Sequence, residues 1–258
     1  MENTTIVTAL YNIQREHNGD GRKWCDYLQL FKNTLALPLN MIIYVGQEDL
    51  IEYIHLHRNS NVLTKVIFQP LHEIPYAYYE KTFANILNEP SYQSKIRDPN
   101  RVECKLPFYN IIQYSKFKWL ENAANQNPFK SDYFFWMDAG ISRFIPLNLY
   151  HKIKARLQLP TGNLVIQHNH LLKLYPINEH YLWDSQCLMC GTMFGGDFET
   201  IIRFATVIDN QLKERVSKGW INNEQLLLAY IYHQHPEWFG LVFNDTPNHL
   251  CLFEKIFI

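Results

Sequence analysis

The first quarter of the chain alternates between two patterns of apolar residues. Nearly uninterrupted apolar runs at 5–11, 40–45 and 62–68 are rich in β-branched and aromatic residues, which is typical of strands. Between them, apolar residues recur every three or four positions at 24–35, and 47–57 has a similar helical pattern. The order strand, helix, strand, helix, strand predicts a parallel sheet with helices packed on its faces.

The middle of the chain is predicted to be mainly helical and to end in one buried strand. Helices are expected over 75–87 and from about 108 to 127, with a polar loop at 89–101 between them. Five large apolar residues follow in succession at 133–137, and a strand of this kind is buried on both faces. It stops at the carboxylate of Asp138, which two small residues follow.

The second half is less regular but continues the α/β order. Strands are predicted at 164–167 and 238–243, and a glycine-flanked strand or turn at 190–196. One helix is predicted to start at Asp197 and another near 222–223. No repeat, low-complexity tract or linker stands out between these elements, so the chain is predicted to form one continuous α/β domain.

The composition narrows the class of protein. With 47% hydrophobic and 19% charged residues, the chain is too apolar and too weakly charged to be disordered. Its 24 Lys and Arg against 25 Asp and Glu give a net charge of -1, which argues against a broad nucleic-acid-binding surface. Neither a signal peptide nor a membrane-spanning run is expected, and five cysteines without a secretion signal favour a cytoplasmic protein. A lipid-linked substrate would still allow peripheral contact with a membrane.

Asp138 is the first candidate for chemistry. In an open parallel sheet, ligands bind beyond the carboxyl ends of the strands, so a carboxylate at a strand end faces that crevice. An Asp on a rigid strand offers a hard oxygen ligand to a metal-bound diphosphate, while Ala139 and Gly140 leave room for the ligand. The alternative is that Asp138 only caps the turn that follows the strand.

Three segments resemble the HtrL/YibB family. They are Thr5-Ile6-Val7-Thr8-Ala9, the block from Asn127 to Phe144, and the pair Gly195-Gly196. The family groups bacterial proteins with a GT-A-like glycosyltransferase fold, often associated with surface-polysaccharide biosynthesis. The resemblance spans most of the chain and implies a single GT-A-like domain over residues 1–258, with a mostly parallel central sheet flanked by helices. Residues 1–140 would form the nucleotide-sugar-binding half and residues 141–258 the acceptor-side half.

The same resemblance implies a divalent metal, Mn²⁺ or Mg²⁺, on the diphosphate of the donor. Asp138 stands where such enzymes place the last Asp of an Asp-x-Asp metal motif, but Trp136 occupies the first acidic position. Because only one of the two expected carboxylates is present, either the enzyme does not depend on a metal or another residue supplies the missing ligand. Such enzymes often recruit a His near the C-terminus, and His249 is the best placed. His233 and His235 compete, but they lie at a predicted helix end, where a solvated or capping His is commoner.

Six residues are candidates for donor binding. They are Thr8, Tyr11, Arg15, Arg22, Lys116 and Arg143. The first two follow from the expectation that the end of the first strand lines the nucleotide site, and Tyr11 is either a ring that stacks on the base or a core ring. The arginines and the lysine suit contacts with phosphate. The alternative for Arg15, Arg22 and Lys116 is an ordinary solvated side chain.

An inverting transferase also needs a carboxylate that takes a proton from the acceptor hydroxyl. Asp197 and Glu224 are the candidates. Asp197 follows the glycine-bearing segment 191–196, which resembles the strand that borders the acceptor in many GT-A enzymes. Asp197 could instead be the N-cap of the next helix, and Glu224 an ordinary acidic residue in a first helical turn. A retaining reaction would not need this base.

The sequence therefore predicts a cytoplasmic glycosyltransferase that moves a sugar from a nucleotide-diphospho-sugar to a glycan or lipid-linked acceptor. The alternative hypothesis is a catalytically inactive nucleotide- or carbohydrate-binding protein that kept the GT-A-like fold, and Trp136 in place of an acidic residue supports it. A different nucleotide-using α/β enzyme gains little support, because neither a Gly-x-Gly-x-x-Gly motif nor a P-loop follows the first strand.

Overall fold

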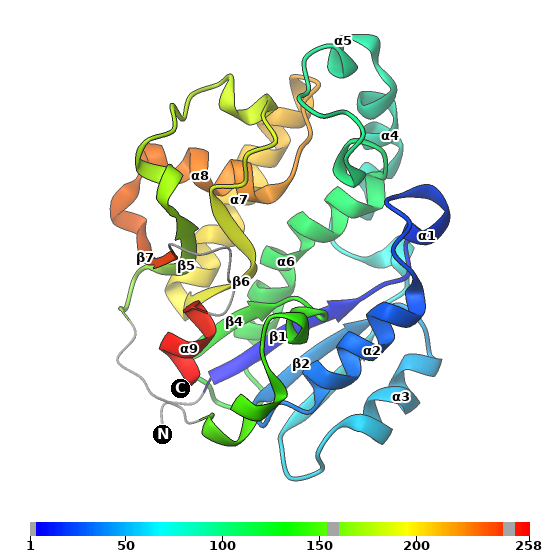
Figure 1. Ribbon diagram of the computed structural model, residues 1–258, viewed down its shortest axis with the longest axis vertical. Helices are drawn as coiled ribbons and strands as arrows, with labels where there is room; N and C mark the ends of the chain where they lie inside the picture. Colours follow the sequence, from blue (N-terminus) through cyan, green and yellow to red (C-terminus); the bar gives the residue numbers. More distant parts are fainter. Residues whose placement is uncertain (1–3, 154–159, 245–250) are drawn as a thin grey trace.

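The computed structural model describes residues 4–153, 160–244 and 251–258, which are arranged around one twisted sheet (Figure 1). The strands of this described part lie in the order β3-β2-β1-β4-β6-β5-β7. Their bounds are β1 (Thr4–Leu10), β2 (Asn40–Val45), β3 (Thr64–Phe68), β4 (Tyr133–Met137), β5 (Leu164–Asn169), β6 (Met189–Asp197) and β7 (Phe239–Asn244). Strand β6 runs antiparallel to its neighbours β4 and β5, whereas the other neighbouring pairs are parallel. The predicted α/β class with a mostly parallel sheet is confirmed.

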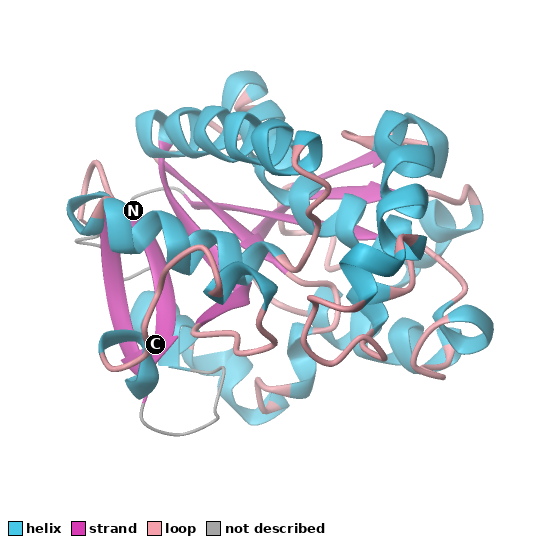
Figure 2. Cartoon of the chain, turned by 90° about the horizontal axis from the view of Figure 1, so that it is seen from above, coloured by secondary structure: helices cyan, strands magenta, loops and turns pink. Residues whose placement is uncertain are grey.

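Helices cover both faces of the sheet (Figure 2). Their bounds are α1 (Arg15–Asn18), α2 (Trp24–Leu35), α3 (Asp49–His57), α4 (Glu80–Asn88), α5 (Pro90–Gln93), α6 (Pro107–Gln126), α7 (Phe198–Ser217), α8 (Glu224–Gln234) and α9 (Cys251–Phe257). Buried residues of α4, α6, α7 and α8 form one hydrophobic cluster with the strands, and those of α2, α3 and α9 form a second. None of the helices in the described ranges combines the length and apolar character needed to cross a bilayer.

Strand β4 contributes to both hydrophobic clusters. All five of its residues are buried. Phe134 and Trp136 belong to the cluster that contains α6, whereas Tyr133, Phe135 and Met137 belong to the cluster that contains α2. Successive side chains of a strand point to opposite faces, so five consecutive large apolar residues fill both layers at once. The predicted burial of this strand on both faces is confirmed, and it fixes the position of the residue that follows, Asp138.

Three segments differ from the predicted elements. Helix α4 begins at Glu80 rather than at 75, because Tyr76 has a left-handed backbone (φ 64°) through which a helix cannot continue. The predicted loop at 89–101 contains the short helix α5, which Pro90 opens at a position where its missing N–H costs nothing. The sequence pattern does not predict α9, whose apolar residues complete the second cluster.

Candidate functional site

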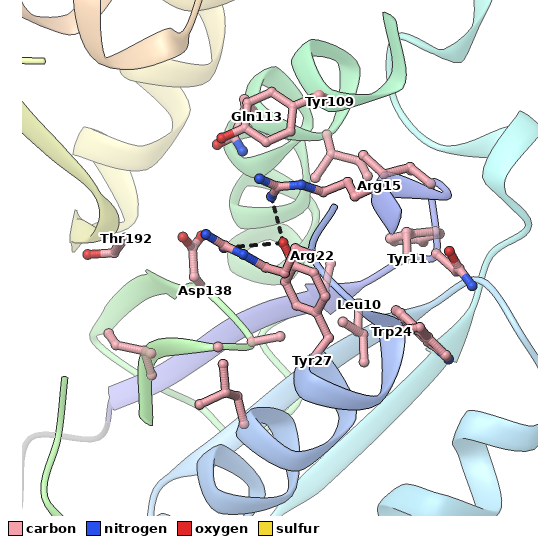
Figure 3. Close-up of a pocket in the computed structure, with 18 of the residues that line it drawn as sticks. Leu10, Tyr11, Arg15, Arg22, Trp24, Tyr27, Tyr109, Gln113, Asp138 and Thr192 are labelled. Atoms are coloured by element: carbon pink, nitrogen blue, oxygen red, sulfur yellow. Dashed lines mark hydrogen bonds between the residues drawn. The ribbon is translucent and has the colours of Figure 1, made fainter. Parts of the chain in front are cut away.

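A cavity of about 520 Å³ opens at the carboxyl ends of β1 and β4 (Figure 3). These strands are neighbours in the sheet, and β2 and β3 lie beyond β1 while β4 lies on its other side. A reversal of strand order of this kind is where open α/β sheets bind ligands. The walls come from the loop after β1, from α2 and α6, from the segment after β4 and from Thr192 of β6. The volume is that of a small-molecule site.

Six of the predicted site residues line this cavity. They are Tyr11, Arg15, Arg22, Lys116, Asp138 and Arg143. Thr8 and Asp197 lie elsewhere, and Glu224 lies behind the cavity wall. His249 falls outside the residues that the structure describes. The cavity at the strand ends thus contains Asp138 and most of the residues predicted to bind the donor.

Lys116 joins the cavity wall to the protein interior, with only 2% of its side chain exposed. Its Nζ lies 3.1 Å from Asp138 Oδ1 and 3.0 Å from Glu224 Oε1, and it donates to the Gly191 carbonyl at 3.0 Å. An ammonium carries three hydrogens, so these three acceptors satisfy it. Burial disfavours the charged form, but the two carboxylates outweigh burial and raise the pKa of Lys116. Lys116 is thus the centre of a buried ion cluster rather than a solvated surface lysine.

Asp138 has one fully engaged oxygen and one that is left for the cavity. Oδ1 accepts from Trp136 Nε1 at 2.7 Å and also contacts Lys116. The backbone N–H of Asp138 donates to the Thr192 carbonyl at 2.8 Å, so the residue is held at both ends. With 31% of its side chain exposed, Asp138 keeps Oδ2 for a ligand. Trp136, in the first position of the expected acidic pair, supplies a donor to the carboxylate instead of a second metal ligand.

The donor set in the described residues does not fit the expected Mn²⁺ or Mg²⁺ site. No three His, Cys, Asp or Glu side chains gather there in a way that could hold a metal ion. Asp138 has a single free oxygen, and the nearby carboxylate of Glu224 shares the ammonium of Lys116. The predicted ligand His249 lies outside the described residues, and the described side chains alone form no metal site.

Glu224 opens helix α8 and is fully buried. Its Oε1 pairs with Lys116, while its Oε2 has no hydrogen-bond partner. A Cβ on Gly191 would come within 2.2 Å of Oε1, so the glycine makes room for the carboxylate. Burial raises the pKa of Glu224 to about 6, against the opposing effect of Lys116. The geometry corrects the expectation that Glu224 is a catalytic base, because the carboxylate does not reach the cavity and instead positions Lys116.

Arg15 is neutralised and held in the cavity wall. It forms an ion pair with Asp20 at 2.5 Å and donates to the Tyr27 hydroxyl at 2.5 Å. Its guanidinium also lies over the Tyr109 ring, 5.0 Å from the centroid. The alternative of a solvated surface arginine is therefore excluded for Arg15, but its charge is already balanced.

Arg22 and Arg143 keep their charge for a ligand. Arg22 contacts the Tyr27 hydroxyl at 3.4 Å, and Figure 3 shows its guanidinium extending toward Asp138. Arg143 lies over the Phe144 ring at 4.5 Å. Among the described residues, neither of these two arginines forms an ion pair with a carboxylate. They give the cavity positive charge that an anion can use.

The two candidates from β1 belong to the core. Thr8 is fully buried and does not line the cavity, which begins at Ala9, so the expectation for Thr8 is corrected. Tyr11 borders the cavity, but its ring is 8% exposed and stacks on Trp119 with the centroids 5.5 Å apart. A Cβ on Gly46 would lie 2.6 Å from the same ring. Of the two alternatives for Tyr11, the structure shows the core ring.

Asp197 lies at the opposite end of the sheet from the cavity. It pairs with Tyr133, the first residue of β4, whereas Asp138 follows the last residue of that strand. Its carboxylate caps helix α7 by accepting from the Thr200 N–H at 2.8 Å, and it also accepts from the Gly162 N–H at 2.6 Å. The expectation of a catalytic base is corrected here, because the N-cap alternative describes this residue.

Sequence reasoning missed part of the lining. The residues concerned are Tyr27, Tyr109, Gln113 and Thr192. Tyr109 and Gln113 precede Lys116 by seven and three positions, so all three share one face of α6, and this spacing could have revealed them. No local pattern marks Thr192, because only the pairing of β6 with β4 brings it to the cavity.

Comparisons with known proteins identify the family but add little on activity. A family model described as "Bacterial protein of unknown function (HtrL_YibB)" matches residues 2–254. No curated protein matches the sequence.

Solved structures that resemble the fold do so at low similarity. Mouse xyloside xylosyltransferase 1 in its apo form is 12% identical with a TM-score of 0.42, over 93% of this chain and 84% of that chain. A presumed nucleotide-diphospho-sugar transferase from Desulfovibrio desulfuricans G20 is 10% identical with a TM-score of 0.43, over 95% of this chain and 80% of that chain. The 4-diphosphocytidyl-2C-methyl-D-erythritol synthase from Anaerococcus prevotii DSM 20548 is 10% identical with a TM-score of 0.37, over 96% and 91%. Likeness at this level carries no argument about activity.

Proposed function

The chain belongs to the HtrL_YibB family, and from this membership and the chemistry of the cavity we propose that it is a glycosyltransferase. It takes a sugar from a nucleotide-diphospho-sugar and passes it to a glycan or lipid-linked acceptor in the biosynthesis of surface polysaccharides. The reaction takes place in the cytoplasm, with peripheral contact with the inner membrane where the acceptor is lipid-linked.

The observation that carries this proposal is the combination of charges at the strand ends. Arg22 and Arg143 line the cavity, and among the described residues neither forms an ion pair with a carboxylate, although the charge of Arg22 also acts on the Asp20 carboxylate. Asp138 lies in the same cavity with one oxygen free. A diphosphate needs cationic donors, and sugar hydroxyls need a fixed acceptor. Both kinds of group are present in a cavity of about 520 Å³.

The same residues divide the chemistry between them. Negative charge develops on the leaving diphosphate as its bond to the sugar breaks, and the two guanidinium groups stabilise that charge. In an inverting reaction, Asp138 Oδ2 takes the proton of the acceptor hydroxyl as that oxygen attacks the sugar. Lys116 and Trp136 hold the carboxylate through Oδ1, so Oδ2 is positioned before the acceptor arrives.

The Asp138→Asn variant tests this proposal. We expect it to slow the release of nucleoside diphosphate from the donor by about a hundredfold or more, because general-base catalysis contributes that much. The thermal shift that the donor induces in the folded protein should persist. Asp132→Asn is the matched control, since Asp132 is an exposed acid six positions earlier. If Asp138→Asn turns over donor as fast as the unmodified protein, the assignment of Asp138 is wrong.

The second candidate function is a nucleotide- or carbohydrate-binding protein without catalytic activity. Its support is Trp136, which replaces an acidic side chain and donates to Asp138. The two functions differ in one measurement. A protein that is stabilised by a nucleotide-sugar, but releases no nucleoside diphosphate with or without glycan acceptors, would be the binding protein rather than the enzyme.

A further inference from the structure

An ammonium lies between the two carboxylates that meet beside the cavity. In the described part of the chain, the carboxylates that come together beside the cavity are those of Asp138 and Glu224, and Lys116 Nζ lies within 3.1 Å of both. A metal ion drawn to these two oxygens would stand beside a like charge at close range, which disfavours its binding. The ammonium is held by the Gly191 carbonyl as well, so it cannot move aside without losing three acceptors.

Trp136 closes the remaining approach to the same oxygen. Its Nε1 donates to Asp138 Oδ1 at 2.7 Å, so this oxygen receives two donors. At the ends of β1 and β4, within the described part of the chain, a cation finds Asp138 Oδ2 but no group of three His, Cys, Asp or Glu ligands, although Glu16 also lines the cavity. The Asp138 carboxylate thus accepts hydrogen bonds from protein donors, and the Trp136 indole N–H is one of them.

The positive charge that a diphosphate needs is present on arginines instead. Arg15 is balanced by Asp20, whereas Arg22 reaches over the Tyr27 ring toward Asp138 without a carboxylate partner among the described residues (Figure 3). Arg143 follows Asp138 by five positions and lines the same cavity. A guanidinium can donate two hydrogen bonds to phosphate oxygens, so the two arginines can bind a diphosphate and offset two of its negative charges.

We infer that this site binds a nucleoside diphosphate without a divalent cation, with Arg22 and Arg143 in the charge-neutralising role and Lys116 fixing Asp138. This inference rests on the proposed function and departs from the metal dependence that the family resemblance implies. It assigns Lys116 a positioning role, because its three hydrogens already have acceptors within the protein.

Calorimetric titration of the full chain tests the inference. The probes are UDP, GDP, ADP and CDP, each titrated in excess EDTA and again in excess Mn²⁺. For the nucleotide that binds, we expect dissociation constants that agree within about threefold between the two conditions, a difference of less than 1 kcal/mol. Binding that disappears in EDTA and returns with Mn²⁺ would overturn the inference and leave the proposed function standing. Absence of binding in both conditions would overturn the proposed function and the inference with it.

Two further measurements test whether nucleotide binding depends on the arginines or on a bound metal ion. Arg22→Gln should weaken nucleotide binding about tenfold or more in EDTA, because it removes a charged hydrogen bond to the ligand. Arg203→Gln is the matched control, since Arg203 lies on α7 away from the cavity and donates to the Gly162 carbonyl. Equal binding by both variants would contradict the role of Arg22.

Electron paramagnetic resonance of Mn²⁺ gives a readout that does not depend on nucleotide or turnover. The unmodified protein should leave the signal of free Mn²⁺ undiminished when protein is in excess. Stoichiometric loss of that signal would show a metal site and overturn the inference.

Discussion

Lys116 is a charged side chain in the protein interior, where lysine is rare. It is 2% exposed, and it remains charged because two carboxylates and a carbonyl surround it. An arrangement of this kind is stable only while every member is present. Removing one partner leaves the others as uncompensated buried charges, which costs more than the pair contributes.

Replacement of Lys116 should therefore lower the stability of the folded protein considerably. We expect Lys116→Met to lower the free energy of unfolding by about 3–5 kcal/mol, because Glu224 is left buried without a counter-charge. The double variant Lys116→Met with Glu224→Gln should lose less, since the fully buried side chain at position 224 then carries no charge. Urea denaturation measures both changes.

Lys118→Met, two positions along the same helix, is the control. Lys118 is partly exposed and pairs with Glu121 at 2.8 Å, so its replacement should change stability by about 1 kcal/mol or less. Similar losses for the variants at 116 and 118 would contradict the account of the buried cluster.

Glu224 should make stability depend on pH. Burial raises its pKa from 4.5 to about 6, so between these values the folded protein binds a proton that the unfolded chain releases. The stability that this proton contributes is fully present below pH 4.5 and is lost as the pH rises through about 6. The free energy of unfolding, relative to that of Glu224→Gln, should fall by about 2 kcal/mol over this window. Urea denaturation at several pH values measures this difference, and a flat difference would show that Glu224 titrates normally.

Most of the secondary structure could be predicted because the pattern was local. The strand at 133–137 and the helix that α6 forms follow from runs and spacings within a few residues. The antiparallel direction of β6 could not be predicted, because direction depends on the partner strand and on no feature of β6 itself. The left-handed backbone at Tyr76, which delays α4, has no glycine or asparagine to announce it.

The site divides in the same way between local and distant information. The strand end at Asp138 is a local signal, and it located the cavity. The contact between Lys116 and Glu224 joins residues 108 positions apart, so no spacing could indicate it. For Asp197 the local sequence is ambiguous, because an Asp just before a helix looks the same whether it caps the helix or acts as a catalytic base. The register of β6 against β4 decides for the cap.

At the scale of elements, the packing of β6 against β4 depends on Gly195. A Cβ at this position would lie 2.2 Å from the Phe134 carbonyl oxygen and 2.6 Å from the Phe135 ring. A backbone atom cannot turn away as a side chain can, so the two strands would have to separate. Thr192, at the cavity end of β6, would move with them.

We expect Gly195→Ala to destabilise the protein by about 1–3 kcal/mol, as overpacking in a core does. Gly140→Ala is the control, because the nearest atom to its added Cβ is 3.6 Å away on Leu30. Urea denaturation of the two variants measures the difference. Equal stabilities would show that the strands can separate without cost and that the close approach is not required.

At the scale of the whole molecule, positive charge is concentrated in the cavity and is not a property of the whole surface. The net charge is -1, so the surface as a whole does not attract anions. The positive groups that matter, Arg22 and Arg143, are placed in one cavity by the loop after β1 and by the segment after β4. The two segments meet because β1 and β4 are neighbours in the sheet. The positive charge that could attract an anionic ligand therefore comes from the order of the strands, which brings two arginines together, and not from the net charge of the protein.

The hydrogen bond from the Trp136 indole to Asp138 has an optical consequence. The emission of an indole shifts with the electric field across its ring, and here the nearest charge is a carboxylate 2.7 Å from the indole nitrogen. Any molecule that comes to rest on Asp138 alters that field. Trp136 therefore links occupancy of the cavity to the intrinsic fluorescence of the protein, to which the five other tryptophans also contribute, with Trp119 stacked on Trp136.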